Sequence, residues 1–264
     1  MKIEGITSCY IGPAISPEQF IPEHFFIYLL RGSIVGYDGH RNSVMRPGEY
    51  CIARKNHLAR YSKQPDAGEF AKVVVIFDEA FLKGFQQRHK IAAASPTIGG
   101  SFLPGEKSGR VQNFVQSLEP YYRGNGQLDE PFADLKREEL LLILLQIHPD
   151  WAGILFDFGI PEKIDLEAFM NKNYKFNVSI ERFAYLTGRS ISSFKRDFRQ
   201  IFNDTPSRWL IQKRLREAYF LISKKGKKPS DIYLDIGFED LSHFSFAFKK
   251  LFGATPGSLL GKPS

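Results

Sequence analysis

Residues 188–206 read GRSISSFKRDFRQIFNDTP, and residues 237–256 read GFEDLSHFSFAFKKLFGATP. Each stretch begins with glycine, repeats phenylalanine at every fourth position and ends in Thr-Pro, and corresponding positions lie 49 or 50 residues apart. Side chains at i, i+4 and i+8 share one helical face, so each copy predicts a helix that packs this stripe inward. The two stripes are Phe194, Phe198 and Phe202, and Phe244, Phe248 and Phe252.

Each glycine follows a segment that predicts a shorter helix. Residues 180–187 come after Ser179, and residues 231–236 come after Ser230. Serine is preferred just before a helix because its hydroxyl accepts a hydrogen bond from a free backbone N–H group. Glycine adopts the backbone angles of a tight turn at little cost. The sequence therefore predicts a helix-turn-helix unit twice.

The faces opposite the phenylalanine stripes are mainly polar and basic. At about 100° per residue, the first helix turns outward Ser192, Arg196, Arg199 and Gln200, with Ser193 at the edge. The second turns outward Ser242, Phe246, Lys249 and Lys250, with His243 at the edge. Arginine binds guanine through two hydrogen bonds, whereas serine and glutamine bond base edges or phosphates. We expect the first helix to read bases in a DNA groove and the lysines of the second to contact phosphates.

The net charge is concentrated in the second half of the 264 residues. Residues 1–160 hold 17 Lys and Arg against 18 Asp and Glu, giving −1, whereas residues 161–264 hold 19 against 11, giving +8. A local basic excess is expected of a domain that contacts phosphates, although basic domains without nucleic-acid partners exist. Two domains are therefore expected, with a boundary near Pro161.

A third helix is predicted between the two copies. Pro206 suits its first position, and the segment continues to about Lys224. Its apolar stripe is Ile211, Leu215, Ala218 and Ile222. At about 1.5 Å per residue it would be roughly 28 Å long. It could hold two recognition helices about one DNA turn, roughly 34 Å, apart in successive major grooves.

Residues 165–260 resemble the DNA-binding domain of the AraC/XylS family of bacterial transcription regulators. The resemblance is strongest in residues 179–198, SIERFAYLTGRSISSFKRDF, and in residues 235–256. It implies DNA contacts from Ser192, Lys195, Arg196 and Arg199, and from Leu241, Ser242, Ser245 and Lys249. With the outward residues added, the candidate DNA-binding residues are Ser192, Ser193, Lys195, Arg196, Arg199, Leu241, Ser242, Ser245, Phe246, Lys249 and Lys250.

The second unit departs from the family pattern at two places. Members often carry arginine where this chain has Phe246, and Leu259 and Leu260 replace a common aromatic-arginine pair. An outward Phe246 cannot donate to guanine, so the unit would prefer the methyl group of thymine or be nearly indifferent. Alternatively, a rotated helix would bury Phe246 in the core.

The amino-terminal half predicts strands followed by helices. The strands are expected at residues 25–30, 33–37, 49–54 and 72–77. Residues 31–33 and 45–49, with His57, are similar to the cupin-like sensor domain that these regulators often carry. Helical spacing begins at Asp78. The predicted class is α+β: a cupin-like β-barrel with a helical appendage, residues 1–160, then an all-α domain with two helix-turn-helix units, residues 161–264.

The strongest helix of the first half begins at Pro131. Its run LLLILL, residues 140–145, is apolar on too many faces for a solitary surface helix. The helix is either sandwiched within its own domain or buries one side against a second subunit. On the second interpretation the protein is a homodimer, at least on DNA, through residues 131–146.

Export, membrane insertion and metal catalysis are disfavoured. Residues 1–10 do not resemble a secretory signal, and the run 140–145 is far shorter than the roughly 18 residues of a membrane-spanning helix. We expect a cytoplasmic protein without membrane contact, in which Cys9 and Cys51 are reduced thiols. The sequence has no His-x-His, and its sheet-region histidines, His24, His40 and His57, are isolated. No catalysis, metal or cofactor is expected.

The favoured function is sequence-specific regulation of transcription through double-stranded DNA and RNA polymerase. Control would come from a small effector or a partner protein at the amino-terminal domain, and a small effector needs an apolar cavity with a few inward polar groups. The alternative is a metal-independent cupin-like module whose basic domain binds nucleic acid without sequence preference. RNA is less favoured, because the aromatic residues lie on helical stripes and not on a base-stacking sheet.

Overall fold

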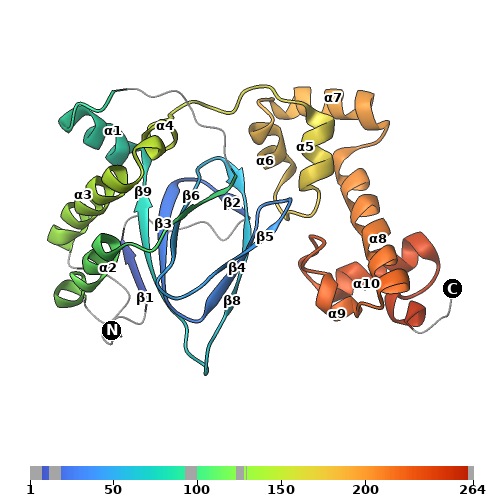
Figure 1. Ribbon diagram of the computed structural model, residues 1–264. Coiled ribbons are helices and arrows are strands. Elements are labelled where there is room, and N and C mark those ends of the chain that lie inside the picture. The colour runs from blue at the N-terminus through green and yellow to red at the C-terminus, as the bar shows by residue number, and fades with distance from the viewer. Residues whose placement is uncertain (1–7, 12–18, 93–99, 123–127, 129, 261–264) are drawn as a thin grey trace. The chain divides into compact units, whose positions relative to one another are not determined.

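The computed structural model describes residues 8–11, 19–92, 100–122, 128 and 130–260. The chain divides into two compact units, Met1–Gly159 and Ile160–Ser264. Figure 1 shows sheets and helices in the first unit, and helices alone in the described part of the second. The α+β class predicted from the sequence is confirmed.

The amino-terminal unit contains a five-stranded sheet with the order β1-β9-β3-β6-β10. These strands are β1 (Ser8–Ile11), β3 (His24–Arg31), β6 (Tyr50–Ala53), β9 (Ala71–Phe77) and β10 (Phe102–Gly105). Strand β1 runs parallel to β9, and the other pairs are antiparallel. A second sheet has the order β5-β4-β8, and a third pairs β2 with β7. Their strands are β2 (Phe20–Ile21), β4 (Ser33–Tyr37), β5 (Asn42–Met45), β7 (His57–Leu58) and β8 (Arg60–Gln64).

The four strands predicted from sequence are present as β3, β4, β6 and β9, but the closed cupin-like barrel is not formed by the described strands. A register shift between Leu29 and Arg31 interrupts the pairing of β3 with β9. Gly32, at φ +80°, then turns the chain into β4. A bulge followed by a positive-φ turn redirects a strand, so β4 pairs with β5 and β8 in a separate sheet.

Helices cover one face of the five-stranded sheet (Figure 1). They are α1 (Glu79–Arg88), α2 (Gly109–Gln116), α3 (Glu130–Ile147) and α4 (Ala152–Leu155), with short 3-10 turns at Glu119–Tyr121 and Pro149–Trp151. Asp78 begins α1 by accepting a 3.0 Å hydrogen bond from the backbone of Phe81. Phe26, Val75 and Phe77 of the sheet share a buried core with Phe85 of α1 and Phe114 of α2. The opposite face of the sheet packs toward Ile34 of β4.

The leucine-rich run of α3 belongs partly to this core. Leu140, Leu141 and Leu144 are fully buried within the unit. For these three residues, the interpretation that the helix packs inside its own domain is therefore confirmed. Leu142 is 38% exposed and Leu135 is 63% exposed. The helix therefore keeps an outward apolar face. None of the described helices is long and apolar enough to cross a membrane.

The carboxy-terminal unit consists of helices in the predicted order. They are α5 (Leu166–Asn173), α6 (Ile180–Leu186), α7 (Ile191–Phe202), α8 (Pro206–Lys225), α9 (Pro229–Ile232) and α10 (Leu241–Phe252), with a 3-10 turn at Pro256–Leu259. Ser179 caps α6 by accepting a 3.1 Å hydrogen bond from the backbone of Arg182. Helix α8 begins at Pro206 and has 20 residues, which corresponds to about 30 Å.

The helix predicted at residues 231–236 is shorter and begins earlier. Helix α9 starts at Pro229, whose fixed φ suits a first helical position, and Lys228 takes the capping place. The hydroxyl of Ser230 donates to the Asp231 carboxylate instead of capping the helix. After Ile232 the chain continues in turns to Gly237. The capping prediction for Ser230 was therefore wrong.

Candidate DNA-binding surface

Helix α7 is held in place by its packed inner face and by a cap at each end. The Ser190 hydroxyl accepts a hydrogen bond from the backbone of Ser193, and Asn203 ends the helix in the left-handed conformation. Phe194 and Phe198 are fully buried. The Phe202 ring lies 4.6 Å from that of Trp209 at the start of α8. These contacts fix which face of α7 is left for a ligand.

The outward face of α7 carries the residues expected from the helical spacing. Ser192, Lys195, Arg196 and Arg199 are exposed, and Ser193 is half-buried. The Ser190 hydroxyl donates a 3.1 Å hydrogen bond to the Ser193 hydroxyl. The face therefore presents three cations and the exposed hydroxyl group of Ser192. These are hydrogen-bond donors that match guanine edges and phosphate oxygens.

Helix α10 repeats this construction with a more apolar outer face. Asp240 caps it by accepting a 2.6 Å hydrogen bond from the backbone of His243, and Phe244 and Phe248 are fully buried. Its exposed candidates are Leu241, Ser242, Phe246, Lys249 and Lys250, while Ser245 is half-buried. The ring of Phe246 is 70% exposed. The interpretation that places this ring in the core is therefore wrong.

Each helix-turn-helix glycine lies where a side chain does not fit. Gly188 has φ +64°, and a β-carbon there would overlap the backbone of Glu162 and Lys163. Gly237 has φ +97°, and a β-carbon would come within 2.7 Å of the Lys175 carbonyl oxygen and 2.8 Å of Arg214 Nε. Both turns are thus packed against other segments of the unit, which sets the orientation of the helix that follows.

Arg214 of α8 joins the two halves of the unit. Its guanidinium donates to the carbonyl oxygens of Tyr174, Phe176 and Gly237 at 2.7, 2.8 and 2.9 Å. Burial lowers the pKa of Arg214 to about 10, so the group stays charged near neutral pH. Sequence reasoning missed this residue. The signal available in the sequence was its position beside the apolar stripe, three residues after Ile211 and four before Ala218.

Asp197 lies between the turn and the outer face of α7. Its carboxylate contacts Arg189 Nε at 3.1 Å and Arg196 Nη2 at 3.1 Å, and Lys163 Nζ lies 3.7 Å away. Hydrogen bonds from Arg189 and Arg196 lower the pKa of Asp197, which keeps it ionised. Arg189 and Asp197 were also absent from the residues singled out in the sequence.

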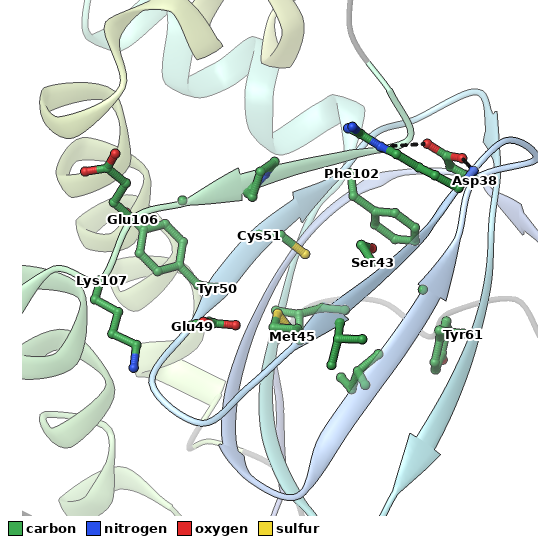
Figure 2. A pocket seen from close by; sticks show the side chains of 17 residues that line it. Asp38, Ser43, Met45, Glu49, Tyr50, Cys51, Tyr61, Phe102, Glu106 and Lys107 are labelled. Atoms are coloured by element: carbon green, nitrogen blue, oxygen red, sulfur yellow. Dashed lines mark hydrogen bonds and ion pairs between the residues drawn. The ribbon is translucent and has the colours of Figure 1, made fainter.

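The amino-terminal unit contains a cavity of about 430 Å³ lined by both larger sheets (Figure 2). Its apolar wall includes Ile27, Ile34, Met45 and Phe102. Asp38 and Arg41 form a 3.9 Å ion pair at one end, and Glu106 and Lys107 lie at the other. Apolar walls with a few polar groups are typical of small-molecule sites.

His24 and Cys51 of the sheets, whose chemistry could serve a metal or redox site, are buried. The backbone of Lys55 donates to His24 Nδ1 at 3.2 Å, and burial lowers the pKa of His24 to about 3. Cys51 is a buried free thiol whose pKa is raised by burial to about 12. Among the described residues, no three His, Cys, Asp or Glu side chains gather in a metal-binding group. Residues 1–7 and the side chain of Cys9 lie outside this description.

Both units match families of known proteins. Residues 24–150 match the ExsA N-terminal regulatory domain, and residues 183–262 match a helix-turn-helix domain. The transcriptional regulator ExsA of Pseudomonas aeruginosa is 23% identical over 266 residues, covering 95% of this chain and 91% of ExsA. The arabinose operon regulatory protein of Salmonella typhimurium is 23% identical, covering 86% of this chain and 79% of that protein. The chain belongs to the AraC/XylS family.

This AraC/XylS-family regulator is similar to a third protein over a shorter span. The virulence regulon transcriptional activator VirF of Yersinia enterocolitica is 26% identical over 148 residues, and the match covers 55% of this chain and 53% of VirF. These relatives are transcription regulators by name, and no enzyme family is indicated. The resemblance drawn from the repeated motif is confirmed, and the chain is a DNA-binding transcription regulator.

Substituting Phe246→Arg in this AraC/XylS-family regulator should leave its stability within about 0.5 kcal/mol of wild type, because the position is exposed. The new guanidinium should add a preference for guanine in the second half of the DNA site. Phe244→Arg is the matched control, because it places the same charge at a fully buried position of α10. It should lower the free energy of unfolding several-fold more than Phe246→Arg does. Thermal unfolding and base preference measure the two effects. A large loss of stability in Phe246→Arg itself would contradict the outward position.

Proposed function

We propose that the chain binds double-stranded DNA with α7 and α10 in successive major grooves, and that α7 supplies most of the base discrimination. The observation that carries this proposal is the outward exposure of Arg196 and Arg199 opposite the buried phenylalanine stripe. Arginine is suited to two-point recognition of guanine. Lys249 and Lys250 of α10 are assigned to phosphates, which contribute affinity without base preference.

Arg196→Ala should cost about 1 to 3 kcal/mol at the preferred site and relax base preference at one position. Lys249→Ala should weaken binding to all sequences similarly and lower the salt slope of log affinity by about one unit. Titrations of the two variants against the preferred duplex and a random duplex, at several salt concentrations, measure both effects. Equal losses for Arg196→Ala on both duplexes would make Arg196 a phosphate contact, and an unchanged slope would remove Lys249 from the interface.

The amino-terminal unit is proposed to regulate this binding. Support comes from its match to a regulatory domain and from the cavity beside β3, β4 and β6. The cavity favours a small effector over a partner protein as the controlling molecule, because a concave site with apolar walls and a few polar groups suits a small molecule. We also propose that the DNA-bound protein contacts RNA polymerase at the promoter, and we place the protein in the cytoplasm with that machinery.

We also propose that the regulator is a homodimer through the outward face of α3. Phe132, Leu135 and Leu142 are exposed on this helix at spacings that bring them to one side. Burial of such a stripe against its copy would remove apolar area from water. A symmetric dimer presents the same patch on both subunits, so one stripe is sufficient.

Leu142→Arg should weaken self-association at least about tenfold, because a symmetric interface would then bury two like charges. Sedimentation of the full chain at micromolar concentration measures the change. Leu234→Arg is the control, since it alters a 53% exposed leucine of the other unit. A wild-type chain that is monomeric at this concentration, or a Leu142→Arg variant that associates normally, would contradict the dimer.

A further inference from the structure

Arg196 is oriented on α7 by the side chain next to it. Its Nε and Nη2 atoms lie 3.3 and 3.1 Å from Oδ1 of Asp197, so the carboxylate occupies one edge of the guanidinium. The guanidinium has five N–H donors in a fixed planar arrangement. One edge can therefore be paired while the end of the group remains available for two hydrogen bonds to a guanine. The side chain of Arg196 is 66% exposed, which leaves that end accessible.

The Asp197 carboxylate is itself held from the inner side. Its Oδ2 atom contacts Arg189 Nε at 3.1 Å, and the side chain of Arg189 is only 7% exposed. Arg189 Nη1 also donates to the carbonyl oxygens of Thr187 at 2.7 Å and Ile164 at 3.0 Å. The glycine turn and the segment before α5 therefore both anchor Arg189. This anchoring gives Asp197 a fixed position from which to orient its neighbour.

We propose that Asp197 is a specificity-positioning residue, which holds the guanidinium of Arg196 in the plane required for two-point recognition of a guanine. The inference rests on the proposed role of Arg196 in base reading and adds a residue that does not itself touch DNA. A carboxylate repels phosphates, so Asp197 would lower affinity for all DNA unless it improved recognition. Its place beside the groove-facing arginine is explained by orientation of that arginine. A flexible arginine loses more conformational entropy on binding than one already held in place.

The test is selection of bound DNA from a randomised duplex library by the full-length chain. Asp197→Asn should reduce the guanine preference at the Arg196 position about threefold to tenfold, and affinity for unselected DNA should stay equal or rise. The double variant with Arg196→Ala should lose no more preference there than Arg196→Ala alone. Glu217→Gln is the control, because it removes a carboxylate that pairs with Lys175 at 2.9 Å, away from α7.

The outcomes separate this inference from the proposed function. A wild-type chain that enriches no sequence would overturn both. A wild-type chain that enriches one sequence, with Asp197→Asn keeping full preference at every position, would overturn the inference alone. Equal loss on all sequences together with a lower melting temperature would assign Asp197 a structural role and also overturn it. If Asp197→Asn does not fold, Asp197→Glu, which displaces the carboxylate by one methylene, should show the same single-position loss, and an unchanged preference would count against the inference.

Discussion

Arg214→Leu is expected to destabilise the carboxy-terminal unit by about 3 to 5 kcal/mol, because it removes three hydrogen bonds from a charged donor, each of which contributes about 1.5 to 3 kcal/mol. Three carbonyl oxygens accept hydrogen bonds from this guanidinium, and one of them belongs to the turn glycine of the second helix-turn-helix unit. The substitution should also weaken DNA binding, since it frees the turn that orients α10. Urea unfolding followed by tryptophan fluorescence measures the change.

Arg216, two residues after Arg214, provides a matched control. Arg216 is exposed on the same helix and donates to Gln212 at 3.2 Å, so Arg216→Leu should change stability by less than about 0.5 kcal/mol. The sequence has two tryptophans, Trp209 in the carboxy-terminal unit and Trp151 in the other. A Trp151→Phe background therefore makes Trp209 the reporter. Equal effects of the two leucine substitutions would show that Arg214 does not join the two halves.

Gly188→Ala is expected to cost about 2 to 4 kcal/mol. About 1 kcal/mol arises from placing a β-carbon at positive φ, and a further 1 to 3 kcal/mol, roughly, from overlap with a packed backbone. The overlap is with residues 162–163, which a β-carbon at position 188 would displace. The same fluorescence measurement of unfolding applies.

Gly226→Ala separates the two contributions. Gly226 has φ +62°, nearly the value at Gly188, but a β-carbon there meets nothing within 4 Å. Its substitution should therefore cost only the conformational part, about 1 kcal/mol. If Gly188→Ala were no more destabilising than Gly226→Ala, the close approach of the first turn to residues 162–163 would not matter for stability.

The sequence predicted the recognition helices well because their signals are local. A phenylalanine at every fourth position, a preceding glycine and a capping residue all act within a few turns of one helix. The same spacing predicted that Phe246 faces outward, and the ring is 70% exposed. The boundary of α9 was missed because Pro229, which also suits a helix start, was passed over in favour of Ser230.

The sequence patterns did not predict contacts between residues that lie far apart in the chain. Residues 25–30 and 72–77 read clearly as strands, but alternation does not say which strand pairs with which. The departure from a barrel at Gly32 therefore appeared only in the structure. Arg189, Asp197 and Arg214 were missed for a related reason, because their roles come from partners up to 40 residues away. A charged side chain beside an apolar stripe was the one local signal, and it applied to Arg214 alone.

The central claim is that this chain discriminates among DNA sequences through its two helix-turn-helix units. The most direct test compares the affinity of the full chain for a duplex selected from a random library with its affinity for a scrambled duplex of the same composition, at physiological salt. Specific DNA-binding proteins prefer their sites by about a thousandfold or more, and we predict a ratio of that order. Equal affinity for both duplexes would contradict the account and leave only a basic domain that binds DNA through its charge.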